Sequence, residues 1–169
     1  MSPAPTGPGN ETAMQLRPLG PDDIDLICRH RESMFRDSGR SEAVIAAMAA
    51  PFRVWLAPKL ADGLYFGWAV QDAEGRDVAG LGMMEIDWPP HPAHPLDDRR
   101  GYVLNVYVEP EARRRGLARM LMAEAVAEGK RRGLSFMILH ATDEGRPLYE
   151  SLGWADTAEM ALIIADGVG

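Results

Sequence analysis

The chain has 169 residues, of which 46% are hydrophobic and 25% charged, which is the size and composition of one globular domain. Its formal net charge of −7 disfavours a nucleic-acid-binding protein and is compatible with a cationic substrate such as an amine. The single cysteine, Cys28, cannot form an intrachain disulfide, and its helical spacing from Ile24 and Ile27 predicts a core position. We expect no secretory signal and no membrane span, because no apolar run approaches roughly 20 residues, and therefore a cytoplasmic location.

The first half of the chain predicts one strand, two helices and a hairpin. Residues 1–11 predict a disordered lead, which a single domain over 12–169 follows. Pro21 suits the first turn of a helix, and Ser41 suits the N-cap of the next one. In chain order we expect a strand over 13–18, a helix over 21–37, a helix from Ser41 to about Gly63 with a break or kink at Pro51, strands over 64–71 and 77–87, and a proline-rich loop over 88–99.

The second half alternates strands and helices. Two glycines interrupt the preceding strand, Gly80 and Gly82, and they predict close backbone approach or a bulge. In chain order we then expect a strand over 101–109, a helix from Gly116 to 130–133, a strand over 134–141 covered on both faces, a short helix over 144–152, and a last strand around MALIIA. The order predicts an α/β fold, a mixed sheet flanked by helices.

The most informative stretch is VLNVYVEPEARRRGLA, residues 103–118, in which a strand leads into a helix start. Pro110 has no amide hydrogen for a sheet, so the strand should end there. The first amides of a helix lack internal partners and carry the positive end of the helix dipole. Gly116 has no side chain to keep an anion away from those amides, and the arginines before it add positive charge. The stretch therefore predicts a pyrophosphate cradle.

This arrangement resembles the acyl-CoA site of the GNAT superfamily of N-acetyltransferases. The cradle pattern of that family, Arg or Gln, two residues, Gly, one residue, Gly or Ala, is matched by Arg113, Gly116 and Ala118. A second segment, LHATDEGRPLYESLGW over 139–154, resembles the next family motif, with Trp154 where Phe is commoner. The resemblance covers roughly 12–164 and implies the GNAT-like acyl-CoA N-acyltransferase fold.

The resemblance implies an acetyl-CoA-dependent N-acetyltransferase that works by direct attack of an amine on the thioester, without a covalent enzyme intermediate. It places acetyl-CoA, as co-substrate, on the cradle and on a strand that splays from its neighbour at a bulge. The expected cofactor-binding residues are Val106, Tyr107, Val108, Arg113, Arg114, Arg115, Gly116, Leu117 and Ala118. The alternative is that the arginines are a solvated helix start and Gly116 a turn.

Thioester aminolysis needs an acid for the leaving thiolate and a base for the amine, because a lysine-like amine has a pKa near ~10.4 and a thiol near ~8.5. The resemblance places Tyr149 where the family has its acid, with a tyrosine that only anchors the helix as the alternative. Glu85 is the candidate base, and a surface glutamate is the alternative. Asn105 and Tyr107 could orient a water, and we interpret His140 as a structural histidine at the end of a buried strand.

The acceptor is an amine on a small molecule or a peptide, which the sequence does not specify. We expect no metal, because His91, His94 and the aspartates after them match no zinc spacing. The competing function is a non-catalytic acyl-CoA-binding or regulatory module, which would not need Tyr149. We expect no nucleic-acid or membrane partner, and the resemblance leaves open a homodimer through the C-terminal strands.

Overall fold

The computed structural model describes residues 14–164, and the predicted lead over 1–11 lies outside the described residues. The helices are α1 (Ile24–Asp37), α2 (Glu42–Ala61), α3 (Leu117–Arg131) and α4 (Arg146–Ser151), with 3₁₀ turns at Pro21–Asp23 and Pro110–Ala112. The strands are β1 (Gln15–Pro18), β2 (Tyr65–Gln71), β3 (Asp77–Asp87), β4 (Arg99–Val108) and β5 (Met137–Leu139). Each element expected before residue 152 is therefore present.

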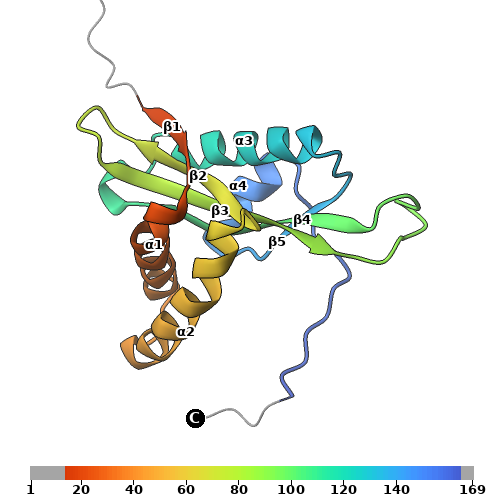
Figure 1. The fold of residues 1–169 in the computed structure, drawn as a ribbon, viewed down its shortest axis with the longest axis horizontal. Coiled ribbons are helices and arrows are strands. Elements are labelled where there is room, and N and C mark those ends of the chain that lie inside the picture. Colours follow the sequence, from red (N-terminus) through yellow and green to blue (C-terminus); the bar gives the residue numbers. More distant parts are fainter. Residues whose placement is uncertain (1–13, 165–169) are drawn as a thin grey trace, which may run out of the picture.

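The described strands form one mixed sheet in the order β1-β2-β3-β4-β5. Neighbours are antiparallel except β4 and β5, which are parallel. Helices α1 and α2 cover one face of this sheet and α3 lies on the other (Figure 1). The expected fold class, a mixed sheet flanked by helices, is confirmed.

Two apolar cores hold these layers together. The larger core lies between the sheet and α3 and includes Leu81, Met83, Val103 and Leu121. The smaller core lies between the sheet and α1 and α2, and Cys28 is buried in it, as the helical spacing predicts. Residues of β4 contribute to both cores, Val103 to the larger one and Leu104 to the smaller one, so the two faces of this strand lie in different chemical surroundings.

Helix α2 begins at the expected cap, where the Ser41 hydroxyl accepts a hydrogen bond from the Val44 amide. It continues without interruption past Pro51, where a break or kink was expected. Within residues 14–164, α2 is the one helix whose length and apolar composition would allow it to cross a membrane, contrary to the expectation of no membrane span. Core helices of soluble proteins meet the same criterion, and one side of α2 packs into the smaller core, so the criterion alone is weak evidence for a membrane span.

Strands β3 and β4 lose register at one point, beside the two glycines of β3. Gly80 pairs with Tyr107 whereas Gly82 pairs with Leu104, so β4 has one residue more than β3 between these two pairs. Gly82 has no room for a side chain, because a Cβ there would lie 1.9 Å from the Tyr65 hydroxyl oxygen. Of the two predicted alternatives, close backbone approach or a bulge, the bulge is confirmed.

The C-terminal part of the sheet differs from the expectation. Strand β5 has three residues instead of the eight expected over 134–141, and only Ile138 of the three is buried. The predicted last strand is wrong for the residues described, because 155–164 have no regular structure and are exposed. Both differences have one physical reason: the outer edge of β5 has no neighbouring strand among the described residues, so neither segment gains ladder hydrogen bonds there.

Candidate functional site

The loop before α3 has the backbone of an anion cradle. Arg114 and Gly116 both have left-handed backbone angles, with φ of 63° and 77°. A Cβ added to Gly116 would meet nothing within 4 Å, so open space lies over this helix start. Among the described residues, the amides from Arg114 to Arg119 donate to no recorded acceptor. Several free amides beside a left-handed residue form the kind of concavity that binds anions.

The three arginines of this loop differ in their contacts. Arg114 and Arg115 are exposed, and neither forms an ion pair with any described residue. Arg113 instead turns back: its Nε donates to the Val108 carbonyl over 3.0 Å, and its guanidinium forms an ion pair with Asp37 at the end of α1. Arg113 therefore anchors the loop to β4 and α1, whereas the other two cations face solvent around the free amides.

A notch between β4 and β5 leads from this cradle. The two strands pair only from Gly101 to Val103 on β4, so the residues from Leu104 to Val108 have no partner on the β5 side among the described residues. Apart from the Val108 carbonyl, which accepts a hydrogen bond from Nε of Arg113, their backbone groups on that side have no ladder partner, although on the other side β4 continues to pair with β3. An extended, amide-containing molecule could form ladder hydrogen bonds along this free edge.

Asn105 fixes the backbone of β4 at the bulge, and sequence reasoning missed this role. Its backbone has a left-handed φ of 55°, which Asn tolerates better than most residues. Its buried side chain donates to the Tyr65 hydroxyl over 2.9 Å and accepts from Nη1 of Arg31 over 2.7 Å. Because both ends of the amide are engaged, Asn105 is not free to orient a water as expected. The available signal was a lone amide within an apolar strand.

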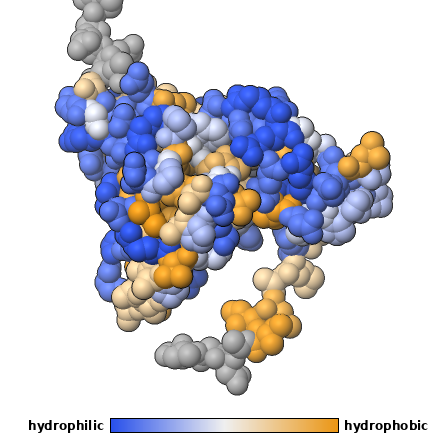
Figure 2. Space-filling view, viewed as in Figure 1, coloured by the Kyte–Doolittle hydropathy of each residue, from blue (hydrophilic) through white to orange (hydrophobic). Residues whose placement is uncertain are grey.

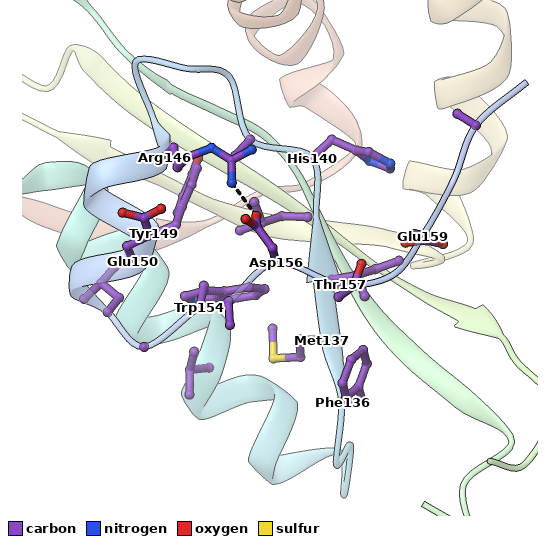
Figure 3. Close-up of a pocket in the computed structure, with 18 of the residues that line it drawn as sticks. Phe136, Met137, His140, Arg146, Tyr149, Glu150, Trp154, Asp156, Thr157 and Glu159 are labelled. Carbon is purple, nitrogen blue, oxygen red and sulfur yellow. Dashed lines mark hydrogen bonds and ion pairs between the residues drawn. The ribbon is translucent and has the colours of Figure 1, made fainter. Parts of the chain in front are cut away.

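Tyr149 lies on α4, on the α3 side of the sheet, where its ring packs against the larger core. Burial raises the pKa of its hydroxyl above the ordinary value of 10.0. The hydroxyl has no hydrogen-bond partner among the described residues, so it is a protonated donor in the neutral pH range. Figure 3 shows Tyr149 at the edge of a groove that α4 shares with β5.

Glu85 lies elsewhere, near the C-terminal end of α3. Its carboxylate forms ion pairs with Nη1 of Arg132 over 2.9 Å and with Arg99. Partial burial raises the pKa of this carboxyl, but the hydrogen bonds from Arg132 and Arg99 outweigh burial, so the net pKa is below its ordinary 4.5. A carboxylate held by two guanidinium groups is a weak proton acceptor, and its role as the base stays a prediction that this geometry disfavours.

A second polar pair lies on the opposite face of the sheet from Tyr149, beside the point where β4 and β5 separate. The Tyr102 hydroxyl and Nδ1 of His140 lie 3.1 Å apart. His140 is exposed, which differs from the expected structural histidine of a buried strand. Sequence reasoning missed the pair, because the two residues are 38 positions apart and meet only through the register of β4 with β5.

The proline-rich loop does not gather metal ligands. His91 and His94 form a backbone bridge, and the His94 ring packs against Phe136. Over residues 14–164, no group of three or more His, Cys, Asp or Glu side chains could hold a metal ion. The loop extends from the β3–β4 hairpin and ends far from the cradle in Figure 1.

Comparisons with known proteins identify the family. The family model for the acetyltransferase (GNAT) family matches residues 29–154. No curated protein matches the chain. A GNAT acetyltransferase from Ralstonia eutropha JMP134 is 54% identical, with 90% of this chain and 99% of that chain covered and a TM-score of 0.87.

Two further solved structures support the fold. A predicted acetyltransferase from Clostridium acetobutylicum, solved with acetyl-CoA, is 28% identical, with 89% of this chain and 96% of that chain covered and a TM-score of 0.81. A ribosomal-protein-alanine N-acetyltransferase from Brucella melitensis is 21% identical, with 92% and 100% covered and a TM-score of 0.65, a similarity of fold alone. The chain belongs to the GNAT acetyltransferase family and is an N-acetyltransferase.

Proposed function

We propose that the protein binds acetyl-CoA across the cradle and the notch and transfers the acetyl group directly to a primary amine. The pyrophosphate lies against the amides from Arg114 to Ala118, with the charges of Arg114 and Arg115 beside it. The pantetheine arm extends along the free edge of β4, at Val106 to Val108. The observation that carries this proposal is the continuity of the two features, because a row of free amides at a helix start leads into an unpaired strand edge.

In this arrangement Tyr149 is the acid. When the amine attacks, the carbon–sulfur bond breaks and the thiolate takes a proton, which the Tyr149 hydroxyl donates. The raised pKa of this hydroxyl keeps it protonated throughout the neutral range. General-acid catalysis of this kind typically contributes about 10² to 10⁴ in rate.

The acceptor amine approaches from the other face of the sheet, where Tyr102 and His140 lie. Imidazole is the side chain that most often accepts a proton in catalysis, and His140 is exposed beside the separation of β4 and β5. We therefore place the base at this pair in preference to Glu85, whose carboxylate is held by Arg99 and Arg132. The reaction proceeds in the cytoplasm on an amine of a small molecule or a peptide, and needs no covalent intermediate.

Steady-state kinetics with acetyl-CoA and a panel of amines test the proposal by following release of the free thiol. Direct attack predicts initial-rate lines that intersect, whereas a covalent acetyl-enzyme gives parallel lines. Tyr149→Phe should lower kcat by about 10² to 10⁴ with an unchanged Kd for acetyl-CoA.

Tyr107→Phe is the comparison on the cofactor strand, because it removes only a hydroxyl from a ring that packs against His30 and leaves the backbone edge proposed to bind pantetheine unchanged. It should keep the wild-type kcat within about twofold. If Tyr149→Phe transfers acetyl groups at the wild-type rate across the pH range, Tyr149 is not the acid.

A further inference from the structure

Arg31 is a half-buried arginine of α1 that forms no ion pair with any described residue. It lies between the two helices and the sheet, with its guanidinium 4.9 Å from the centre of the Phe35 ring and 4.5 Å from the centre of the Phe52 ring. Burial lowers the pKa of this guanidinium from its ordinary 12.5, and no carboxylate is among the groups that act on it. An arginine stays charged at neutral pH, so a cation lies here without a counter-ion among the described residues.

One edge of the Arg31 guanidinium has no hydrogen-bond acceptor. Nη1 donates to Oδ1 of Asn105 over 2.7 Å, which fixes the orientation of the group. Nε is buried and donates to none of the described residues, and neither does Nη2 beside it. We call these two N–H donors the open edge of Arg31. Two parallel N–H groups on a guanidinium match the two oxygens of a carboxylate.

The hydrogen bond to Asn105 does not account for a charged residue at this position. An amide oxygen also accepts from a neutral donor, so a cation is not needed to hold Asn105. Burying a charge and a donor without partners destabilises a fold, and cation–π contacts offset only part of this. A bound anion would pair with the charge and accept from the open edge. Arg31 is therefore suited to a ligand rather than to the fold alone.

The open edge lies on the same face of the sheet as the pair of Tyr102 and His140. Asn105, which holds Arg31, is two residues beyond Val103, the last residue of β4 that pairs with β5. Tyr102 is close enough for its hydroxyl to act on the pKa of Arg31, which it raises, and this hydroxyl lies 3.1 Å from Nδ1 of His140. One tyrosine therefore separates the arginine from the histidine that we place at the acceptor amine.

The surroundings of Arg31 favour a small carboxylate over an acidic macromolecule. Arg53, on the neighbouring helix α2, is already paired with Asp25 of α1. Helix α2 exposes apolar side chains, among them Val44 at 59% and Val54 at 75%, and Figure 2 shows orange and tan residues where Figure 1 places α2. An acidic protein or a nucleic acid requires a surface with several free cations. One open edge with two donors fits a single carboxylate.

We propose that the acceptor is a small amine that also carries a carboxylate, as an amino acid does, and that the open edge of Arg31 binds this carboxylate. The inference rests on the proposed function, because it names the class of acceptor for the amine site beside Tyr102 and His140. With its carboxylate on Arg31, the acceptor directs its amine toward that pair, where β4 and β5 separate. Arg31 takes no part in proton transfer and selects the acceptor by charge.

Calorimetry on the protein saturated with CoA tests this inference, because CoA has no acetyl group and the acceptor can bind without reacting. The probes are α-, β- and γ-amino acids, each matched with its carboxamide, which keeps the amine and lacks the carboxylate. At least one acid should bind about 10- to 100-fold more tightly than its amide. If CoA binds but acid and amide have equal affinity, or no acid binds at millimolar concentration, or phosphoethanolamine binds in preference, this inference is overturned and the proposed function is not. Failure to bind CoA would overturn the proposed function as well.

Two arginine variants identify the residue responsible. Arg31→Met keeps an unbranched apolar side chain and should remove the preference for acid over amide, with the Kd for CoA within about twofold of wild type. Arg100→Met is the matched control, because the Arg100 guanidinium also lies over two rings, 3.9 Å from the centre of Trp88 and 4.4 Å from the centre of Phe136, and it should keep the full preference.

A purely structural role for Arg31 predicts that Arg31→Met weakens the binding of acid and amide equally, so a preference that survives this substitution overturns the proposal. The comparison of acid with amide on the wild-type protein decides the question without the variant if Arg31→Met does not fold.

Discussion

Both ends of α3 carry exposed or partly exposed arginines, but those at the C-terminal end form ion pairs with described residues. At the C-terminal end, Arg131 forms ion pairs with Glu124 over 2.6 Å and Glu128 over 2.7 Å, and Arg132 forms ion pairs with Glu128 and Glu85. The Arg132 guanidinium also stacks 3.8 Å from the centre of the Phe66 ring. At the N-terminal end, the loop arginines 114 and 115 are exposed and have no acidic partner among residues 14–164.

The difference separates structural charge from charge available to a ligand. Cations near a helix C-terminus are favourable in the dipole, and here carboxylates also neutralise them. Cations near a helix N-terminus are unfavourable in the same field, so the fold gains nothing from them there. The anionic cofactor that we propose would explain their position, because it would interact with the arginines and with the free amides together. The contrast can be tested with paired substitutions at the two ends.

The largest expected effect comes from Gly116→Glu. The new carboxylate would lie where we propose that the phosphates bind, and the Kd for acetyl-CoA should rise by at least about a hundredfold, measured by calorimetry. Gly133→Glu is the matched control at the other end of α3, because Gly133 also has a left-handed φ, 70° against 77°, and open space around its Cβ position. It imposes the same backbone strain and should leave the Kd unchanged. Equal loss of binding in both variants would mean that strain, and not the cradle, is responsible.

A smaller effect is expected when the arginines themselves are replaced in pairs. Arg114→Gln with Arg115→Gln should raise the Kd for acetyl-CoA about tenfold at low salt, and less at high salt because salt screens exposed charges. Arg131→Gln with Arg132→Gln should leave the Kd within about twofold and instead lower Tm by roughly 2–4 °C, since these residues hold the fold. A Kd that responds equally to both pairs contradicts the contrast between the two ends.

The smallest effect is a pH dependence of stability at the C-terminal end. The arginines there hold the pKa of Glu128 below its ordinary 4.5, through hydrogen bonds from Arg132 and then Arg131, and the pKa of Glu85 is lowered as well. A lowered folded pKa contributes stability that is fully present above about pH 4.5 and is lost as the pH falls through the folded value. Arg132→Gln should therefore lower Tm at pH 7 by a few degrees and make little difference near pH 3.

Burial lowers the pKa of His30 to about 4, and this group also destabilises the fold as the pH falls from 6.5. Its contribution is common to wild type and variant, so the difference between their Tm values isolates the carboxylates. A difference that stays constant from pH 7 to pH 3 would show that Arg132 stabilises the protein by packing on Phe66 alone.

Local chemistry made most of the fold predictable. Strand β3 has the expected bounds because a polar turn and a proline-rich loop limit it on either side. The start of α3 was predictable because Pro110 ends a strand and Gly116 opens a helix within a few residues. The last strand could not be predicted in this way. An apolar composition favours a strand, but a strand also needs a neighbouring strand to pair with, and residues 160–164 have none among the described residues.

The geometry of the candidate site was predictable where one segment carries it and not where distant segments meet. The cradle lies within residues 113–118, and its glycine and following alanine are visible in sequence. Arg113 forms an ion pair with Asp37, which is 76 positions away in the sequence. Glu85 forms one with Arg132, which is 47 positions away. Likewise Asn105 meets Arg31 only after α1 packs on β4. Partners at such separations leave no periodic signal in a single sequence.

The most direct test of the account is a calorimetric titration of the wild-type protein with acetyl-CoA. The free amides and unpaired arginines at the start of α3 predict saturable binding at one site per chain, with an affinity that falls as salt is added. Absence of binding at millimolar acetyl-CoA would contradict the cradle, and with it the assignment of the cofactor to this end of the helix.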